Sequence, residues 1–170
     1  MTAAVFVDTN ILVYLRDERS PTKQRLSNEW LTALWRDQSG RTSFQVLSEY
    51  YVTVTRKLRP QMDPAAAWAD VHELMAWKPQ EINAALLHEA RGIETRYKLS
   101  WWDSLIVGAA RLQDCKWLLT EDLQDGAVVG GVVIRNPFLR TLSESLAEYE
   151  VRSEPKRLHP SRGRPVLPAR

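Results

Sequence analysis

The chain has 170 residues, of which 44% are hydrophobic and 26% charged, values typical of one soluble globular domain with a core of its own. Its single cysteine, Cys115, excludes an internal disulfide and a zinc site made of cysteines alone. No apolar stretch approaches the roughly 20 residues of a membrane-spanning helix, and no basic region precedes the short N-terminal apolar run, so we expect a cytoplasmic protein.

The net charge of +2 is unevenly distributed along the chain. Residues 152–170 carry six basic residues and one acidic residue, a net charge of +5, whereas residues 1–151 carry 17 basic and 20 acidic residues, a net charge of −3. The tail is also rich in proline and cannot build a core, so we expect it to be disordered in isolation. The isoelectric point of the whole chain is therefore poor evidence for a nucleic-acid-binding face.

The N-terminal half is predicted to begin with a strand and to continue with helices. The apolar run Ala3–Val7 stops at Asp8, which is typical of a buried strand, and Thr9 or Asn10 is expected to cap the following helix. Further helices are expected where apolar residues recur at helical spacing, over residues 22–37, 44–58, 64–77 and 82–97.

Two stretches and three tryptophans in this half require a choice between interpretations. Residues 41–43 indicate either a short strand or a connector. The β-branched run Val52–Thr55 locally favours a strand, but the longer helical pattern around it decides for a helix. Trp30, Trp35 and Trp68 fall on apolar stripes, so core packing is favoured over stacking against nucleic-acid bases.

The C-terminal half is predicted to alternate helices and strands. Ser100 is expected to cap a helix over Trp101–Gln113, and strands are expected over Lys116–Leu119 and Val132–Ile134. A last helix is predicted from Phe138 to about residue 151. The glycines of this half mark turns at Gly126, Gly130 and Gly131. This alternation predicts an α/β fold with a parallel sheet and helices on both faces.

Four carboxylates occupy positions suited to chemistry. Asp8 and Asp122 each follow an apolar strand, and the carboxyl ends of parallel strands face one crevice. Glu49 lies in the middle of a helix, and Asp103 lies one turn into a helix on the side predicted to face the core. Carboxylates buried together repel one another unless a cation lies between them, and Mg²⁺ or Mn²⁺ prefers oxygen ligands. The pattern therefore indicates a site for a hard divalent ion.

These motifs resemble the PIN domain family and, within it, the VapC toxins of toxin–antitoxin pairs. The motifs are Asp8-Thr9-Asn10, Ser48-Glu49-Tyr50, Trp101 to Ile106, Leu119 to Asp122 and the closing Asn136-Pro137-Phe138. The resemblance covers about residues 1–140 and implies a PIN-like three-layer α/β fold with a central, mostly parallel sheet flanked by helices. A helical extension over 141–151 and the basic tail over 152–170 depart from compact members of the family.

The resemblance implies a Mg²⁺- or Mn²⁺-dependent endoribonuclease, in which a metal-activated water hydrolyses an RNA phosphodiester bond. Asp8 and Asp103 would be direct metal ligands, and Glu49 and Asp122 would complete the catalytic site directly or through water. Three polar side chains would orient the carboxylates or water: Thr9, Asn10 and Thr120. The implied partners are the RNA substrate, a small antitoxin whose C-terminal peptide blocks the metal site, and a second copy of the chain.

Other interpretations of the same residues stay open. A basic cluster after the Glu49 helix is either a contact for RNA phosphate or a solvated helix end: Arg56, Lys57 and Arg59. Trp101 or Trp102 could border the cleft, and Asp125 competes with Asp122 for the same role. A DNA nuclease or phosphatase with the same acids, and a PIN-fold binding module without catalysis, are the rival functions. A receiver-type signalling domain is disfavoured because the first strand is followed by one acid and not by adjacent acids.

Overall fold

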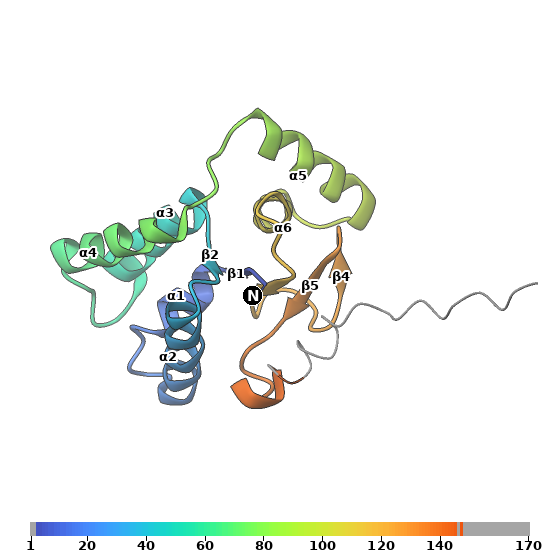
Figure 1. Cartoon of the computed structure of the whole chain (residues 1–170). Coiled ribbons are helices and arrows are strands. Elements are labelled where there is room, and N and C mark those ends of the chain that lie inside the picture. Colours follow the sequence, from blue (N-terminus) through green and yellow to red (C-terminus); the bar gives the residue numbers. More distant parts are fainter. Residues whose placement is uncertain (1–2, 146, 148–170) are drawn as a thin grey trace, which may run out of the picture.

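A five-stranded sheet runs through the middle of the protein (Figure 1). The computed structural model describes residues 3–145 and 147. The strands, in the order in which they lie in the sheet, are β2 (Gly40–Arg41), β1 (Val5–Val7), β3 (Trp117–Leu119), β5 (Val132–Arg135) and β4 (Val128–Val129). All neighbours pair in parallel except β4 and β5, which pair antiparallel. The predicted α/β class with a mostly parallel sheet is confirmed.

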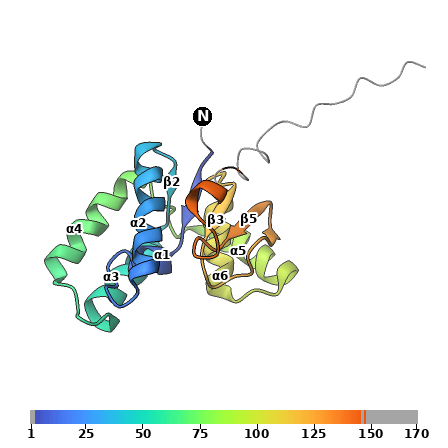
Figure 2. The same ribbon diagram turned by 90° about the horizontal axis from the view of Figure 1, so that it is seen from below.

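Helices cover the sheet in two groups. They are α1 (Thr9–Tyr14), α2 (Pro21–Arg36), α3 (Phe44–Val52), the π-helical turn η1 (Thr53–Lys57), α4 (Pro64–Leu74), the 3₁₀ turn η2 (Met75–Trp77), α5 (Ala84–Tyr97) and α6 (Trp101–Leu112). In both Figure 1 and Figure 2, α1 to α4 lie together on one side of the sheet, and α5 and α6 lie on the other. No helix in the described part of the chain is long and apolar enough to cross a membrane.

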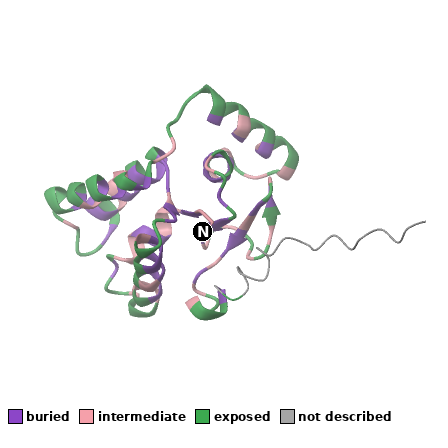
Figure 3. Ribbon diagram, viewed as in Figure 1, coloured by how far each residue is buried: buried purple, intermediate pink, exposed green. Residues whose placement is uncertain are grey.

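The core forms where the strands meet these helices (Figure 3). Phe6 and Val7 of β1 and Leu118 and Leu119 of β3 have no exposed surface, as expected for parallel strands that are covered on both faces. Helix α6 is buried from Ser104 to Ala110. This packing holds the ends of β1 and β3 in place. The residues that directly follow the two strands therefore also have defined positions.

Local capping explains most of the helix starts. Ser100 accepts a hydrogen bond from the N–H of Asp103 at 3.1 Å, as predicted, and Asp63 caps α4, which begins at Pro64. The prediction for α1 was wrong, because Asp8 itself is the N-cap: its Oδ1 accepts from the N–H of Thr9 at 2.6 Å. Because Asp8 directly precedes α1, its carboxylate oxygen satisfies a backbone N–H that the first turn of the helix leaves without a partner.

Other expectations differ from the structure for reasons of tertiary packing. The helix expected over 44–58 is not α-helical throughout, because it widens into a π-helical turn at Thr53. Trp68 is 54% exposed and therefore does not pack in the core as predicted. Ile82 is 55% exposed, although Leu86, Ala90 and Ile93 of the same predicted helix are buried. Strand β4 was not predicted from the sequence, and its turn to β5 contains Gly130 and Gly131, two of the three predicted turn glycines. The last helix was predicted to begin at Phe138, but 138–141 are not helical and the described helical residues are 142–145 and 147. Residues 148–151 and the basic tail lie outside the described residues.

Candidate active site

The ends of β1 and β3 bring two of the predicted acids to one edge of the sheet. Val7 pairs with Leu119, so the two parallel strands end side by side. The backbone N–H of Asp8 donates to the carbonyl of Leu119 at 3.0 Å, and this bond ties the residue after β1 to the last residue of β3. Asp8 and Asp122 therefore lie at the edge where open α/β sheets bind ligands.

Thr120 joins these two acids through short hydrogen bonds. Its hydroxyl donates to Asp8 Oδ2 at 2.8 Å and accepts from Asn10 Nδ2 at 3.2 Å. Asn10 Nδ2 also donates to Asp122 Oδ2 at 2.9 Å, and the N–H of Asp122 donates to the Thr120 hydroxyl at 3.1 Å. Asn10 and Thr120 thus hold the two carboxylates in fixed positions, which is the arrangement expected of residues that orient acids.

Helix α3 contributes a third acid to this network. The Thr9 hydroxyl donates to Glu49 Oε2 at 3.1 Å, and Gln45 donates to Glu49 Oε1 at 3.0 Å. Glu49 and Asp122 are both exposed. Both reach solvent-accessible space, whereas Asp8 is half-buried.

The environment of Asp8 opposes its negative charge. Burial raises the pKa of Asp8 from 3.8 to about 6, and the charges of Asp122 and Glu49 act in the same direction. The hydrogen bonds from Thr120 and Thr9 act against this rise and only partly offset it. A carboxylate held in this way is stabilised by any cation that comes within contact distance.

Asp103 takes no part in the hydrogen-bond network that links the other three acids among the described residues. Its Oδ2 accepts a hydrogen bond from the Ser100 hydroxyl at 2.7 Å, at the start of α6. Asp103 is half-buried, whereas Ile106, Val107 and Ala110 on the predicted core face are buried. The expectation that Asp103 faces the core is therefore only partly met, because the side chain turns toward the helix cap.

A cleft of about 400 Å³ opens beside the acid network. It is lined by Thr9, Asn10, Val13, Tyr14, Asp17, Arg19, Glu49, Thr53, Lys57, Leu58 and Asp122. Of the predicted basic cluster only Lys57 lines this cleft, whereas Arg56 and Arg59 do not. Trp101 and Trp102 do not line it either, and Trp102 is 62% exposed at the start of α6.

A cluster missed by the sequence reasoning holds the loop after β3. Tyr14 Oη donates to Glu121 Oε1 at 2.6 Å, and Lys23 Nζ donates to Tyr14 Oη at 2.9 Å and pairs with Glu121 Oε2 at 2.5 Å. Lys23 Nζ also lies 5.1 Å from the ring centroid of Phe138. Glu121 is thereby neutralised, which leaves Asp122 as the acid of this loop that reaches the network. Asp125 accepts instead from the N–H of Asn136 at 3.0 Å.

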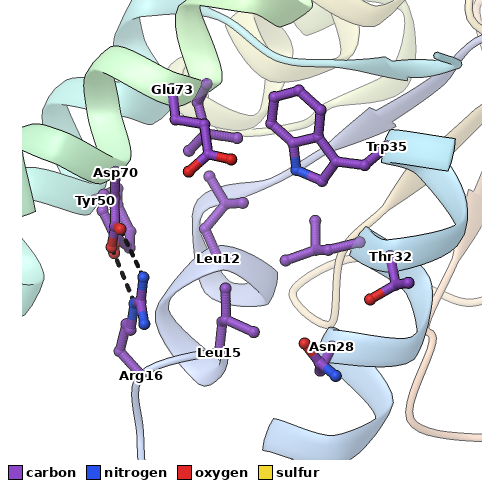
Figure 4. A pocket seen from close by; sticks show the side chains of 11 residues that line it. Leu12, Leu15, Arg16, Asn28, Thr32, Trp35, Tyr50, Asp70 and Glu73 are labelled. Atoms are coloured by element: carbon purple, nitrogen blue, oxygen red, sulfur yellow. Dashed lines mark hydrogen bonds and ion pairs between the residues drawn. The ribbon is translucent and has the colours of Figure 1, made fainter.

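A second, smaller hollow of about 170 Å³ lies between α1, α2 and α4 and shares no lining residue with the cleft (Figure 4). Leu12, Leu15 and Trp35 form part of its wall. Of the two carboxylates that line it, Asp70 accepts from Arg16 Nε at 2.9 Å and is paired, and Glu73 is the other. This hollow is mainly apolar, and the acids that suit metal chemistry belong to the cleft.

Comparison with known proteins decides the family. A family model described as the PIN domain matches residues 5–124, well over half of the chain. The chain belongs to the PIN domain family. Its fold is similar to that of a chain in a toxin–antitoxin complex from Klebsiella pneumoniae, with a TM-score of 0.58 and 22% identity, covering 79% of this chain and 98% of that chain.

This PIN domain is also similar in fold to VapC20 of Mycobacterium tuberculosis, which is described as a toxin that cleaves the sarcin-ricin loop. The TM-score is 0.51 and the identity 22%, and the match covers 70% of this chain and 92% of that chain. No curated protein matches the chain. At this level of identity the two structures support the predicted PIN-like fold.

The donors of the PIN domain's acid network suit a hard divalent ion. All candidate ligands carry oxygen, the donor that Mg²⁺ and Mn²⁺ prefer. Asn10 Oδ1 is buried beside them with no hydrogen-bond partner in the described part of the chain, so this acceptor is unsatisfied at the site. Among the described residues, however, no group of three or more histidine, cysteine, aspartate or glutamate side chains converges closely enough to hold a metal. The carboxylates are instead held by hydrogen bonds from Thr9, Asn10 and Thr120.

Proposed function

We propose that this PIN domain is a Mg²⁺- or Mn²⁺-dependent endoribonuclease and the toxin of a toxin–antitoxin pair. The observation that carries the proposal is the linkage of Asp8, Glu49 and Asp122 through three short polar side chains at the carboxyl edge of the sheet. Membership of a family whose nucleases generally use a divalent metal, and the likeness to the two toxin-associated structures, support it.

Asp8, Glu49, Asp103 and Asp122 would hold the metal in this proposal. When bound, the ion supplies an activated water and neutralises charge on the phosphoryl oxygens. One carboxylate oxygen of Asp8 accepts from Thr120 and the other accepts the capping hydrogen bond, so Asp8 would bind the metal with little freedom to move. Because burial raises the pKa of Asp8, a cation would have to displace its proton below about pH 6.

The first experiment measures cleavage of a mixed RNA pool by the purified protein with Mg²⁺, Mn²⁺ or EDTA. We expect cutting that needs the metal and is lost in Asp8→Asn and Asp103→Asn. Glu18→Gln is the matched control, because it removes an exposed carboxylate that does not line the cleft, and it should leave cleavage unchanged. Full activity in both aspartate variants would contradict the proposal. Competing DNA and small phosphate esters would identify a DNA nuclease or a phosphatase.

A binding module without catalysis is the second candidate function. It is favoured by the absence of Asp103 from the hydrogen-bond network of the other acids among the described residues and by the exposure of Glu49 and Asp122. The same preparation distinguishes the two functions, because a binding module retains RNA without producing new ends under any metal condition. Turnover that exceeds the amount of protein would exclude it.

The proposed protein partners are a small antitoxin and a second copy of the chain. The antitoxin peptide would occupy the cleft and block the acids, as the association named for the Klebsiella structure suggests. Leu139, 64% exposed, supplies apolar surface on which a partner could dock, whereas Leu142 is partly buried against the core. Light scattering of the purified chain measures the proposed homodimer directly.

A further inference from the structure

Two cationic side chains enter the cleft from different segments of the chain. Lys57 comes from the end of η1, and Arg19 comes from the connection between α1 and α2. Both line the cleft together with Glu49 and Asp122, which belong to the acid network. The cleft therefore combines acids suited to a metal with cations suited to phosphate.

Lys57 lies at the end of the π-helical turn that follows the Glu49 helix, and it lines the cleft. In a straight α-helix, a residue eight positions after Glu49 would be rotated by about 80° away from it around the helix axis. In η1 the N–H of Leu58 bonds to the carbonyl of Thr53 at 2.9 Å, which is the wider i to i+5 pattern of a π-helix. The wider turn returns Lys57 to the face of Glu49 and Thr53, and all three side chains line the cleft.

Lys57 is also distinguished from its basic neighbours by its freedom. Among the described residues it has no ion pair and no side-chain hydrogen bond. Arg59, in contrast, folds back and donates to the backbone carbonyls of Arg56 and Leu58 at 3.0 and 2.8 Å. Arg56 is exposed and lies outside the cleft lining. Lys57 is therefore the member of the predicted cluster whose charge is available inside the cleft.

The Nε atom of Arg19 is held by an ion pair, which leaves its two terminal Nη atoms available. Its Nε donates to Asp17 Oδ1 at 3.0 Å, and its side chain remains 59% exposed. Asp17 also accepts from the Ser20 hydroxyl, so this short acidic residue fixes the direction of the arginine. The two terminal amino groups have no partner among the described residues, and a guanidinium presents them well to phosphate oxygens.

We propose that Lys57 and Arg19 bind two backbone phosphates of a single-stranded RNA that crosses the cleft over the acid network. This inference rests on the proposed function and assigns its substrate contacts. A volume of about 400 Å³ suits an unpaired nucleotide, whereas duplex RNA is recognised over a wide, shallow groove. Val13 and Leu58 supply apolar wall on which an unpaired base can lie. The cleft acids repel RNA, so binding requires the divalent ion.

The test is binding of a fluorescein-labelled pool of random 10-nucleotide single-stranded RNA, followed by anisotropy with Mg²⁺ or EDTA. A gel of the recovered probe checks that the RNA is intact. We expect Lys57→Gln and Arg19→Gln each to weaken binding about fivefold, and each to lower the slope of log Kd against log salt by about 0.7, the value for one lost phosphate contact on a single strand. Arg56→Gln is the matched control and should leave affinity and slope unchanged.

Three outcomes would overturn the inference. They are the absence of RNA binding by the wild-type chain, equal weakening by Lys57→Gln and Arg56→Gln, and a preference for duplex RNA over the single-stranded pool. Thermal unfolding of each variant shows that a lost contact, and not a lost fold, explains weaker binding. Failure of the proposed function gives a different result, because binding that depends on Lys57 would then persist without any cleavage.

Discussion

Replacing Asp8 by asparagine should stabilise the metal-free protein at pH 8 and should not stabilise it at pH 4.5. The folded protein holds the Asp8 proton up to about pH 6, whereas an exposed aspartic acid releases it near 3.8. Ionised Asp8 therefore lowers the free energy of unfolding as the pH rises through this window, by about 3 kcal/mol at about 1.4 kcal/mol for each tenfold change. The remaining exposure of the side chain makes this value an upper limit.

Asparagine removes this electrostatic destabilisation and loses little else. It caps a helix as well as aspartate does, so the bond from the Thr9 N–H is retained. Its amide nitrogen cannot accept from Thr120, which costs about 1 kcal/mol. The net gain at pH 8 is about 2 kcal/mol, or about 4–8 °C in Tm for a chain of this size. At pH 4.5 Asp8 is already protonated in the folded protein, so the substitution removes no charge and only the lost hydrogen bond from Thr120 affects stability.

Thermal unfolding followed by circular dichroism, with EDTA and at several pH values from 4.5 to 8, measures this difference. Glu18→Gln serves again as the control and should show no such dependence on pH. Added Mg²⁺ should raise the Tm of the wild type and not that of Asp8→Asn, because the proposed ligand is missing in the variant. An equal Tm difference at pH 4.5 and pH 8, or a lower Tm for Asp8→Asn at pH 8, would refute the reasoning.

Three further predictions concern stability and reactivity. Lys23→Met should lower the free energy of unfolding in urea by about 1–2 kcal/mol, because Glu121 and its neighbouring tyrosine lose their shared cation; an unchanged urea midpoint would contradict this. Gly40→Ala should lower the free energy of unfolding by more than about 1 kcal/mol, because a Cβ there would lie 2.5 Å from the ring of a buried tryptophan. Gly92→Ala is the comparison, because a Cβ there would meet no atom within 4 Å, and it should raise the free energy of unfolding by up to about 1 kcal/mol. Burial raises the pKa of Cys115 to about 12, so its reaction with a disulfide reagent at pH 8 should be slow in the native protein and fast in urea, and equal rates would show that the thiol is accessible.

The sequence by itself determined most of the elements and the candidate acids. Short apolar runs that end in polar residues identified β1 and β3, because buried parallel strands need continuous apolar side chains. Ser100 and Asp63 marked helix starts, because their side chains satisfy backbone N–H groups of their own helices. The order of the acid motifs identified the family, which the match over residues 5–124 confirms.

Tertiary structure decided which of these residues meet. The contact between Asp8 and Thr120 joins positions 112 residues apart, and no local periodicity encodes such a contact. Neutralisation of Glu121 by Lys23, 98 residues away, separates it from its neighbour Asp122 for the same reason. Asp103 accepts a hydrogen bond from the Ser100 hydroxyl at its own helix cap and takes no part in the network of the other acids. Spacing along the chain thus identified the candidate side chains. The pairing of β1 with β3 determined where they lie, because strand register is a long-range property.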